Sequence, residues 1–248
     1  MTALWRVSWA GATDQGKIRS QNQDCFFGDP QGRYLILADG MGGHSSGEIA
    51  SQTTVESVTG VLESFDWKQL PDAEKMVDRC VQTSAENLRK WVKAHPDDAD
   101  LGTTLLIWIR KDNQIVLGSL GDSRIYLMRD KQLFQITCDQ TIETELRRRG
   151  AGRAQALNTV GSSYLSRCIL ASRRCEPDII QIESKPGDIW LLCSDGLTRE
   201  VDTEVIEDIL AANIDTSPQE SVDALIRQAL ENGGRDNVTV VVARIDND

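Results

Sequence analysis

The stretch Tyr34-Leu35-Ile36-Leu37-Ala38-Asp39-Gly40 is the best guide to the fold of this chain. Five consecutive apolar residues predict a buried strand, and the aspartate and glycine after them predict its end. An acid at the end of a buried strand occurs repeatedly in the sequence. Three more aspartates adjoin apolar runs in this way: Asp122 after residues 115–120, Asp195 after 189–194, and Asp236 before 238–242.

The position of these four acids predicts their chemistry. A buried sheet holds the ends of its strands rigidly, so carboxylates there can converge without further movement. Anionic oxygens packed together repel one another, and a hard divalent cation usually offsets that repulsion. The sequence therefore predicts a site for more than one Mg²⁺ or Mn²⁺, and with it metal-assisted chemistry on a phosphate group.

Composition narrows the class of protein. The 248 residues fit one large domain, and the values of 40% apolar and 26% charged residues are ordinary for a soluble globular protein. No apolar run approaches the roughly 18 residues of a membrane span, and residues 1–6 lack the features of a signal peptide. We therefore expect a cytoplasmic protein with no membrane partner. The net charge of −11 argues against nucleic acid as a partner.

The cysteines and histidines exclude other kinds of site. The six cysteines form no Cys-x-x-Cys pair and have no histidines nearby, which predicts reduced thiols, several of them buried. With only His44 and His95 in the chain, a zinc site or a histidine-based triad is disfavoured.

The hydrophobic pattern predicts an α+β protein. Hairpin-linked strands favour antiparallel sheets, and paired helices suit the outside of two stacked sheets, so we expect a layered sandwich. A Rossmann-type fold is disfavoured, because strands and helices do not alternate regularly and no Gly-x-Gly-x-x-Gly follows a strand. The expected elements are strands at 5–12, 25–38, 179–183, 188–194 and 237–245, helices at 47–63, 72–94, 203–212 and 217–231, a four-strand meander at 103–137, and a polar, arginine-rich segment at 141–175.

Asp39 is the strongest candidate for a metal ligand. A carboxylate at this place can bridge two cations, and Gly40 lets its own carbonyl turn inward as another hard ligand. An ordinary Asp-Gly turn is the alternative. However, Gly42-Gly43 and Gly47-Glu48 follow directly, and a loop with so few side chains suits close approach of the backbone to a ligand.

Four other acids rank below Asp39. Asp195 and Asp236 would complete the cage around a metal pair, although each could also be a turn or cap residue. Asp122 comes next, with a salt bridge to Arg124 as its alternative. Asp24 is last, as a cap residue or as an acid standing behind the ligands.

Arg19 is the candidate for binding phosphate. A metal cluster that handles phosphate needs a further cation for the outer oxygens, and the guanidinium fork matches two of them. The alternative is an ordinary surface arginine.

Several segments share the residues and spacing of a known family. They are Thr13-Asp14-x-Gly16 with Arg19-x-x-Asn22-x-Asp24; Ala38-Asp39-Gly40-Met41-Gly42-Gly43-His44 with Gly47-Glu48; Gly102-Thr103-Thr104; Gly121-Asp122-Ser123-Arg124; Gln135-x-Thr137-x-Asp139; Glu176-Pro177-Asp178; Gly187-Asp188; Ser194-Asp195-Gly196-Leu197; and Gly234-Arg235-Asp236-Asn237-Val238-Thr239. Over nearly the whole chain, they resemble the bacterial metal-dependent serine/threonine protein phosphatases (the PPM family, or type 2C phosphatases).

The resemblance implies a single catalytic domain over residues 1–248, folded as a four-layer αββα sandwich with a variable flap at about 140–175. It implies that Asp39 bridges two Mn²⁺ or Mg²⁺ ions and that the Gly40 carbonyl also binds metal. The remaining implied roles are Asp195 and Asp236 on one of the pair, Asp122 with Asp195 on a third, weaker ion, and Arg19 on the substrate phosphate.

The implied reaction is hydrolysis of phosphoserine and phosphothreonine in proteins, the products of a serine/threonine kinase. A hydroxide bridging the two ions would attack phosphorus in line, with no covalent intermediate. We expect a monomer. Two alternatives are a catalytically inactive binding module on the same fold and a metal-dependent phosphodiesterase or nuclease. The intact acids and Arg19 disfavour the first, and the acidic charge disfavours the second.

Three departures from the family pattern affect substrate choice more than activity. Met41 stands where animal relatives carry a histidine, so the leaving-group proton is expected from metal-bound water. Gln140-Thr141 replace the His-Ser of many relatives at the start of the flap, and residues 165–170 follow the family only loosely.

Overall fold

A computed structural model describes residues 6–42, 46–173 and 175–246. Gly43 and His44 of the glycine-rich motif lie outside these ranges. The elements are β1 (Arg6–Asp14), β2 (Asp24–Gly28), β3 (Tyr34–Met41), α1 (Ser46–Glu63), α2 (Ala73–Ala94), η1 (Pro96–Asp98), β4 (Gly102–Thr103), β5 (Leu105–Lys111), β6 (Gln114–Leu120), β7 (Arg124–Arg129), β8 (Gln132–Gln135), α3 (Ile142–Arg148), α4 (Arg153–Leu157), β9 (Ile169–Leu170), β10 (Asp178–Glu183), β11 (Ile189–Cys193), α5 (Asp195–Thr198), α6 (Thr203–Ala212), α7 (Pro218–Glu231) and β12 (Val238–Asp246).

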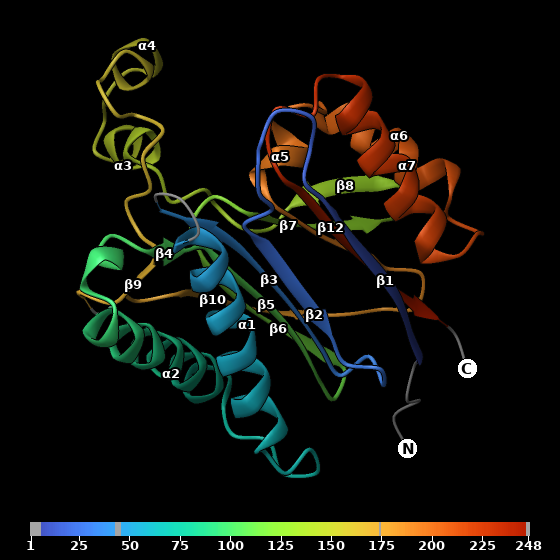
Figure 1. Ribbon diagram of the computed structural model, residues 1–248. Helices are drawn as coiled ribbons and strands as arrows, with labels where there is room; N and C mark the ends of the chain where they lie inside the picture. The colour runs from blue at the N-terminus through green and yellow to red at the C-terminus, as the bar shows by residue number, and fades with distance from the viewer. Residues whose placement is uncertain (1–5, 43–45, 174, 247–248) are drawn as a thin grey trace.

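Two antiparallel sheets form the centre of the molecule. One has the strand order β1-β12-β11-β7-β8, and the other has the order β10-β6-β5-β3-β4-β9, with β2 also paired to β3. The pair α1 and α2 covers one outer face, and α5, α6 and α7 cover the other (Figure 1). The predicted four-layer sandwich is confirmed. Within the described ranges, no helix combines the length and apolarity needed to cross a membrane.

Strand β3 shows why the apolar runs are continuous rather than alternating. Tyr34 and Ile36 pack in the cluster under α1 and α2, whereas Leu35 and Leu37 pack between the two sheets. Successive side chains of a strand point to opposite faces, so a strand covered on both faces needs apolar residues at every position. Strand β11 follows the same rule: Trp190 meets Trp108 edge-on between the sheets, at 6.4 Å between ring centres.

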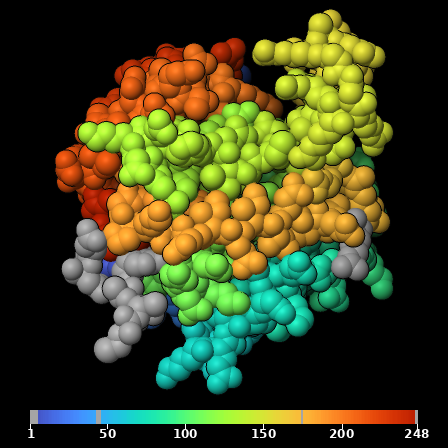
Figure 2. All heavy atoms as spheres, turned by 180° about the vertical axis from the view of Figure 1, so that it is seen from behind, coloured from blue at the N-terminus to red at the C-terminus, as the bar shows by residue number. Residues whose placement is uncertain are grey.

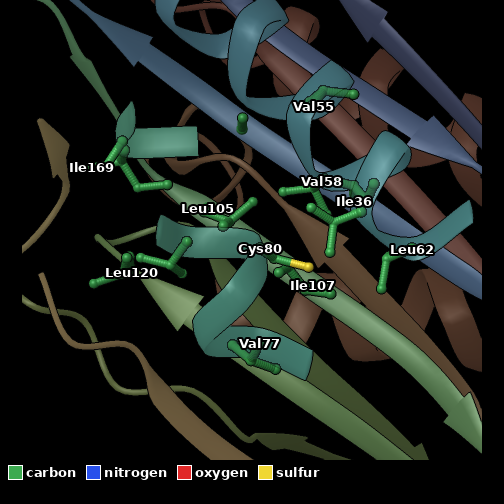
Figure 3. Close-up of a cluster of buried hydrophobic side chains, with 14 of the residues drawn as sticks. Ile36, Val55, Val58, Leu62, Val77, Cys80, Leu105, Ile107, Leu120 and Ile169 are labelled. Carbon is green, nitrogen blue, oxygen red and sulfur yellow. The ribbon is translucent and has the colours of Figure 1, made fainter. Parts of the chain in front are cut away.

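The outer core under α1 and α2 confirms the predicted helix at 72–94, whose buried residues recur every three or four positions. Cys80 of α2 lies beside Ile107 of β5, and Val58 of α1 lies beside Ile36 of β3 (Figure 3). Val77 of α2 packs against Gly118 of β6. Residues at three- and four-residue steps lie on one face of a helix, so this face is buried while the opposite face stays exposed.

The predicted meander at 103–137 is wrong in topology, although its strands are present. β5 and β6 pair in one sheet, whereas β7 and β8 pair in the other. The chain changes sheets at the connection after β6, where Gly121 has a φ of 104° that favours glycine. The predicted strand end before Asp39 is also wrong, because β3 continues to Met41.

The part of the polar segment that carries α3 and α4 forms a lobe that stands away from the sandwich (Figures 1 and 2). Further along the same segment, where the sequence predicts little strand, β9 pairs with β4 in the second sheet. Helix α3 of the lobe has no buried residue, and α4 has only Ala156. Gln140 fastens the start of the lobe: it is fully buried, and its side chain accepts from the Gly121 N–H and donates to the Ser119 carbonyl and to Asp178. The Thr141 hydroxyl then accepts from the Thr144 N–H at the start of α3. Gln140 and Thr141, the two residues that replace the His-Ser of many relatives, thus both have hydrogen-bond partners nearby.

Candidate metal and phosphate site

The site begins at the pairing of β2 with β3. Asp24 and Asp39 lie directly opposite each other in the antiparallel register. Like charges in this position destabilise a sheet unless a proton or a cation neutralises them. The fold therefore places two carboxylates side by side, where a proton or a bound cation would stabilise them.

The backbone around Asp39 is held on both sides. Its N–H donates to the Thr104 hydroxyl at 2.9 Å, and its carbonyl accepts from the Thr103 hydroxyl and the Thr104 N–H, each at 2.9 Å. The Thr104 hydroxyl also contacts that of Ser123, beside Asp122. Gly40 is required here, because a Cβ would collide with the Gly47 carbonyl oxygen.

Asp24 joins the two sheets beneath the site. Its Oδ2 accepts from the hydroxyls of Ser194 and Thr239, each at 2.7 Å. Its Oδ1 is buried and has no partner among the described residues. An ionised oxygen in this state is costly, so Asp24 is one more acid that a nearby cation or a proton would stabilise.

Asp195 and Asp236 come from the other sheet. Asp195 opens α5 directly after β11, with only Ser194 between them, and Asp236 precedes β12. Asn237 positions the second of these acids: its N–H donates to Asp236, and its side-chain amide donates to the carbonyls of Gln15 and Gln21. Asn237 therefore ties the loop that carries Arg19 to the loop that carries Asp236.

Arg19 lies on the rim of the site, with its side chain about half exposed, and donates to Asp236 Oδ2 at 2.8 Å. This contact raises the pKa of the guanidinium above its ordinary value. The sequence predicted Arg19 as a phosphate-binding residue, and the structure adds a contact with one of the acids.

Arg199 is a residue of the site that the sequence did not indicate. It lies four residues after Asp195, and its guanidinium contacts both Asp195 and Asp236, the latter at 3.2 Å. The run Leu197-Thr198-Arg199 carries no distinctive motif, so its role depends on the turn of α5 that brings residues i and i+4 together.

Asp122 follows Gly121 at the turn between the sheets. The alternative of a salt bridge with Arg124 is wrong, because Arg124 binds Asp139 through two hydrogen bonds, at 2.9 and 2.7 Å. Asp122 therefore forms no salt bridge with Arg124, and it lines the cleft.

Burial and mutual repulsion shift the titration of these acids. Burial first, then the charges of Asp24 and Asp195, raise the pKa of Asp39 well above its usual range. Burial, and next the charge of Asp122, raise the pKa of Asp195 to about 7. Burial raises the pKa of Asp24 to about 6, and it raises that of Asp122 as well. Such shifts often mark functional sites.

A cleft of about 490 Å³ is lined by four of the acids and both arginines, together with Gly40, Met41 and Tyr164 of the lobe; Asp24 lies behind it. As the side chains lie, no three acidic, histidine or cysteine residues in the described ranges meet closely enough to hold an ion by themselves. Mg²⁺ usually keeps several waters and binds one or two carboxylates. The donor set of oxygens, with an unpartnered one at Asp24, fits such an ion.

Comparisons with known proteins place this arrangement in a family. A model of the protein phosphatase 2C family matches residues 17–231. The chain is 35% identical over 239 residues to the serine/threonine protein phosphatase PstP of Mycobacterium tuberculosis, covering 96% of this chain but 45% of PstP. It is 32% identical to the serine/threonine phosphatase stp of Listeria monocytogenes, with 94% of each chain covered.

Solved structures agree with the sequence comparison. The crystal structure of the M. tuberculosis PstP/Ppp phosphatase superposes with a TM-score of 0.88 over 98% of this chain and 100% of that one. The PstP catalytic domain has also been solved in complex with two manganese ions, with a TM-score of 0.86 at 35% identity. This chain belongs to the protein phosphatase 2C family.

Proposed function

We propose that this chain is a metal-dependent protein serine/threonine phosphatase. The observation that carries the proposal is the facing pair Asp24 and Asp39, with Asp195 and Asp236 brought to the same cleft from the second sheet. Carboxylates packed this closely favour a hard divalent cation. The two manganese ions of the similar PstP structure support the same choice of cofactor.

We propose for each residue the role that the family resemblance implies. Asp39 would hold two Mn²⁺ or Mg²⁺ ions, the Gly40 carbonyl would be a further ligand, and Asp195 with Asp236 would complete one ion's shell. A third, weaker ion would use Asp122 with Asp195. When bound, the ions would supply a hydroxide for in-line attack on the phosphorus and would neutralise the transferring group.

The remaining residues position the acids and the phosphate. Thr103 and Thr104 hold the Asp39 backbone, so its carboxylate approaches the cleft from a fixed point. Arg19, on the rim, would bind two outer oxygens of the phosphate. Asn237 keeps Arg19 and Asp236 together, which fixes the distance between the phosphate and the acids.

The related phosphatases support phosphoserine and phosphothreonine in proteins as substrates. We further propose that residues 1–248 act as one catalytic domain, that a serine/threonine kinase makes its substrates, and that the chain works as a cytoplasmic monomer.

A hydrolysis assay on the purified protein tests the proposal. Added Mn²⁺ should support release of phosphate from a phosphothreonine peptide and from p-nitrophenyl phosphate, and excess EDTA should abolish it. Bis(p-nitrophenyl) phosphate, a diester, should not be hydrolysed. Preferred hydrolysis of the diester would favour a phosphodiesterase, and no hydrolysis at any Mn²⁺ concentration would favour an inactive binding module.

A further inference from the structure

Arg199 occupies the space between two adjoining clefts. One is the cleft of about 490 Å³ that contains Asp39, and the other, of about 320 Å³, lies beneath α3. Four residues line both clefts: Asp122, Ser163, Asp195 and Arg199. The wall between the clefts therefore carries two acids and one fixed positive charge.

The contacts of Arg199 exceed those of an ordinary helix-surface arginine. An exposed i,i+4 pair with Asp195 alone would be unremarkable and weak. Arg199 also donates to Asp236, which is 37 residues further along the chain, just before β12. Its charge favours the ionised form of Asp122 as well. One guanidinium thus contacts acids from two separate segments and lies near a third acid, Asp122.

We propose that Arg199 is a tethered cation that competes with the third, weakly bound metal ion for Asp195. This inference rests on the proposed metal-dependent function. A guanidinium stays protonated at every pH that the protein experiences, so it cannot leave by losing a proton. An ion entering between Asp122 and Asp195 must displace Arg199 from its carboxylate partner. Occupancy of the third site is therefore set by this chain's own arginine as well as by metal concentration.

Direct Mn²⁺ binding to the purified full chain tests the proposal, by calorimetry and by the electron paramagnetic resonance of free Mn²⁺. In Arg199→Ala and Arg199→Gln, the weak site should bind Mn²⁺ at least about tenfold more tightly than in the wild type. Arg199→Lys keeps the charge, so its weak site should stay near the wild-type affinity. Because Arg199 also contacts Asp236, the affinity of the tight pair should change too, and the two affinities are fitted separately.

Two further variants separate competition from a general effect of charge. Arg147 also lines the cleft beneath α3, and its guanidinium lies 3.9 Å from Glu143 of the same helix. Arg147→Ala removes the same unit of charge and should leave the weak site unchanged. Adding Asp122→Asn to Arg199→Ala should remove the gain, because the tightened ion would lose one of its two acids.

The outcomes also separate this inference from the proposed function. If the wild type binds no Mn²⁺ tightly, the proposed function fails. If the tight pair is intact and Arg199→Ala, Arg199→Gln and wild type share one weak-site affinity, only the competition is overturned. An equal gain in Arg147→Ala would also overturn it, since the effect would then come from net charge alone.

Discussion

The acid-bearing strands and the lobe formed by α3 and α4 are opposite kinds of structure beside one cleft. All five residues of β11 are buried, and seven of the nine in β12 are, whereas α3 buries none. Strands packed between a sheet and helices can open only when the core opens, while helices with few buried contacts can move locally. We propose that the rigid region carries out the chemistry and that the lightly packed one contacts the protein substrate.

The two regions also differ in how their charges are neutralised. The acids of the cleft repel one another, and burial raises the pKa of Asp39 and Asp195. In the lobe, Arg147 and Arg148 already have acidic neighbours within α3, Glu143 and Glu145. We therefore expect charge changes in the cleft to have large effects and those in the lobe to have small ones.

Asp39→Asn should have the largest effect. The amide keeps the shape of the side chain but removes the charge that would hold two cations, so we expect kcat to fall at least about a hundredfold. Steady-state hydrolysis of p-nitrophenyl phosphate at saturating Mn²⁺ measures this loss. Activity within threefold of wild type would contradict the assignment of Asp39.

A buried acid outside the cleft is the matched control for Asp39. Asp188 is 1% exposed and binds Arg129 through two hydrogen bonds. Asp188→Asn should lower the melting temperature of the metal-free protein, because it leaves Arg129 without its anionic partner. Asp39→Asn should raise that temperature, because it removes a carboxylate from a repelling cluster. If the melting temperature changes in the same direction in both variants, the two acids do not lie in contrasting environments.

Arg19→Ala should have the next largest effect. A charge-assisted bidentate contact with phosphate contributes about 1.5–3 kcal/mol, so KM for a phosphopeptide should rise by about one to two orders of magnitude. Because Arg19 also contacts Asp236, Mn²⁺ affinity should change slightly, and Mn²⁺ titration of the variant measures that change. An unchanged KM would refute the role of Arg19 in binding phosphate.

The metal-free protein should lose stability as pH rises from about 4 to about 7. Asp195 has a pKa of about 7 in the folded chain and about 4 when unfolded, so the folded state binds more protons in this window. The stability that this group contributes below pH 4 is therefore lost as the pH rises through the pKa of Asp195 in the folded chain, about 7. Each pKa unit corresponds to about 1.4 kcal/mol.

Denaturant unfolding in EDTA at pH 5 and pH 8 measures this loss. Asp195→Asn removes the group that titrates, so its stability should fall less over the same range. Saturating Mn²⁺ should also flatten the dependence, because a bound cation holds the carboxylate ionised at both pH values. Equal slopes for wild type and Asp195→Asn would show that other groups dominate.

Changing the arginines of the lobe should have the smallest effect. Arg147, Arg148, Arg149 and Arg153 are the densest positive charge in an acidic chain, and we propose that they attract acidic residues beside the phosphorylated one. Replacing all four by alanine should lower kcat/KM for an acidic phosphopeptide by less than about tenfold, since exposed charges interact weakly. Turnover of p-nitrophenyl phosphate should not change. Equal losses on both substrates would indicate a structural role instead.

Much of the fold could be predicted from hydrophobic periodicity. The helices at 72–94 and 203–212 begin and end within one residue of α2 and α6. The error in the meander has a physical cause: each hairpin is specified locally by its own turn, but the sheet that a hairpin joins depends on contacts with distant strands. Nothing in residues 103–137 states that β7 pairs with β11.

The candidate site, like the fold, could be predicted from the sequence only in part. Asp39, Asp122, Asp195 and Asp236 could be selected from sequence, because each adjoins an apolar run. Thr104 could be found only as part of a family motif, and its bond to the Asp39 backbone required the structure.

The sequence alone determined the layered sandwich, the acidic residue types and their places beside the strands, because strand periodicity and residue chemistry are local properties. Only the tertiary structure decided that Asp24 faces Asp39, that Arg19 contacts Asp236 and that Arg199 reaches two acids. These contacts join residues up to 217 positions apart. They depend on how two sheets stack and on which charges the low-dielectric interior leaves without a partner, and no local pattern encodes either.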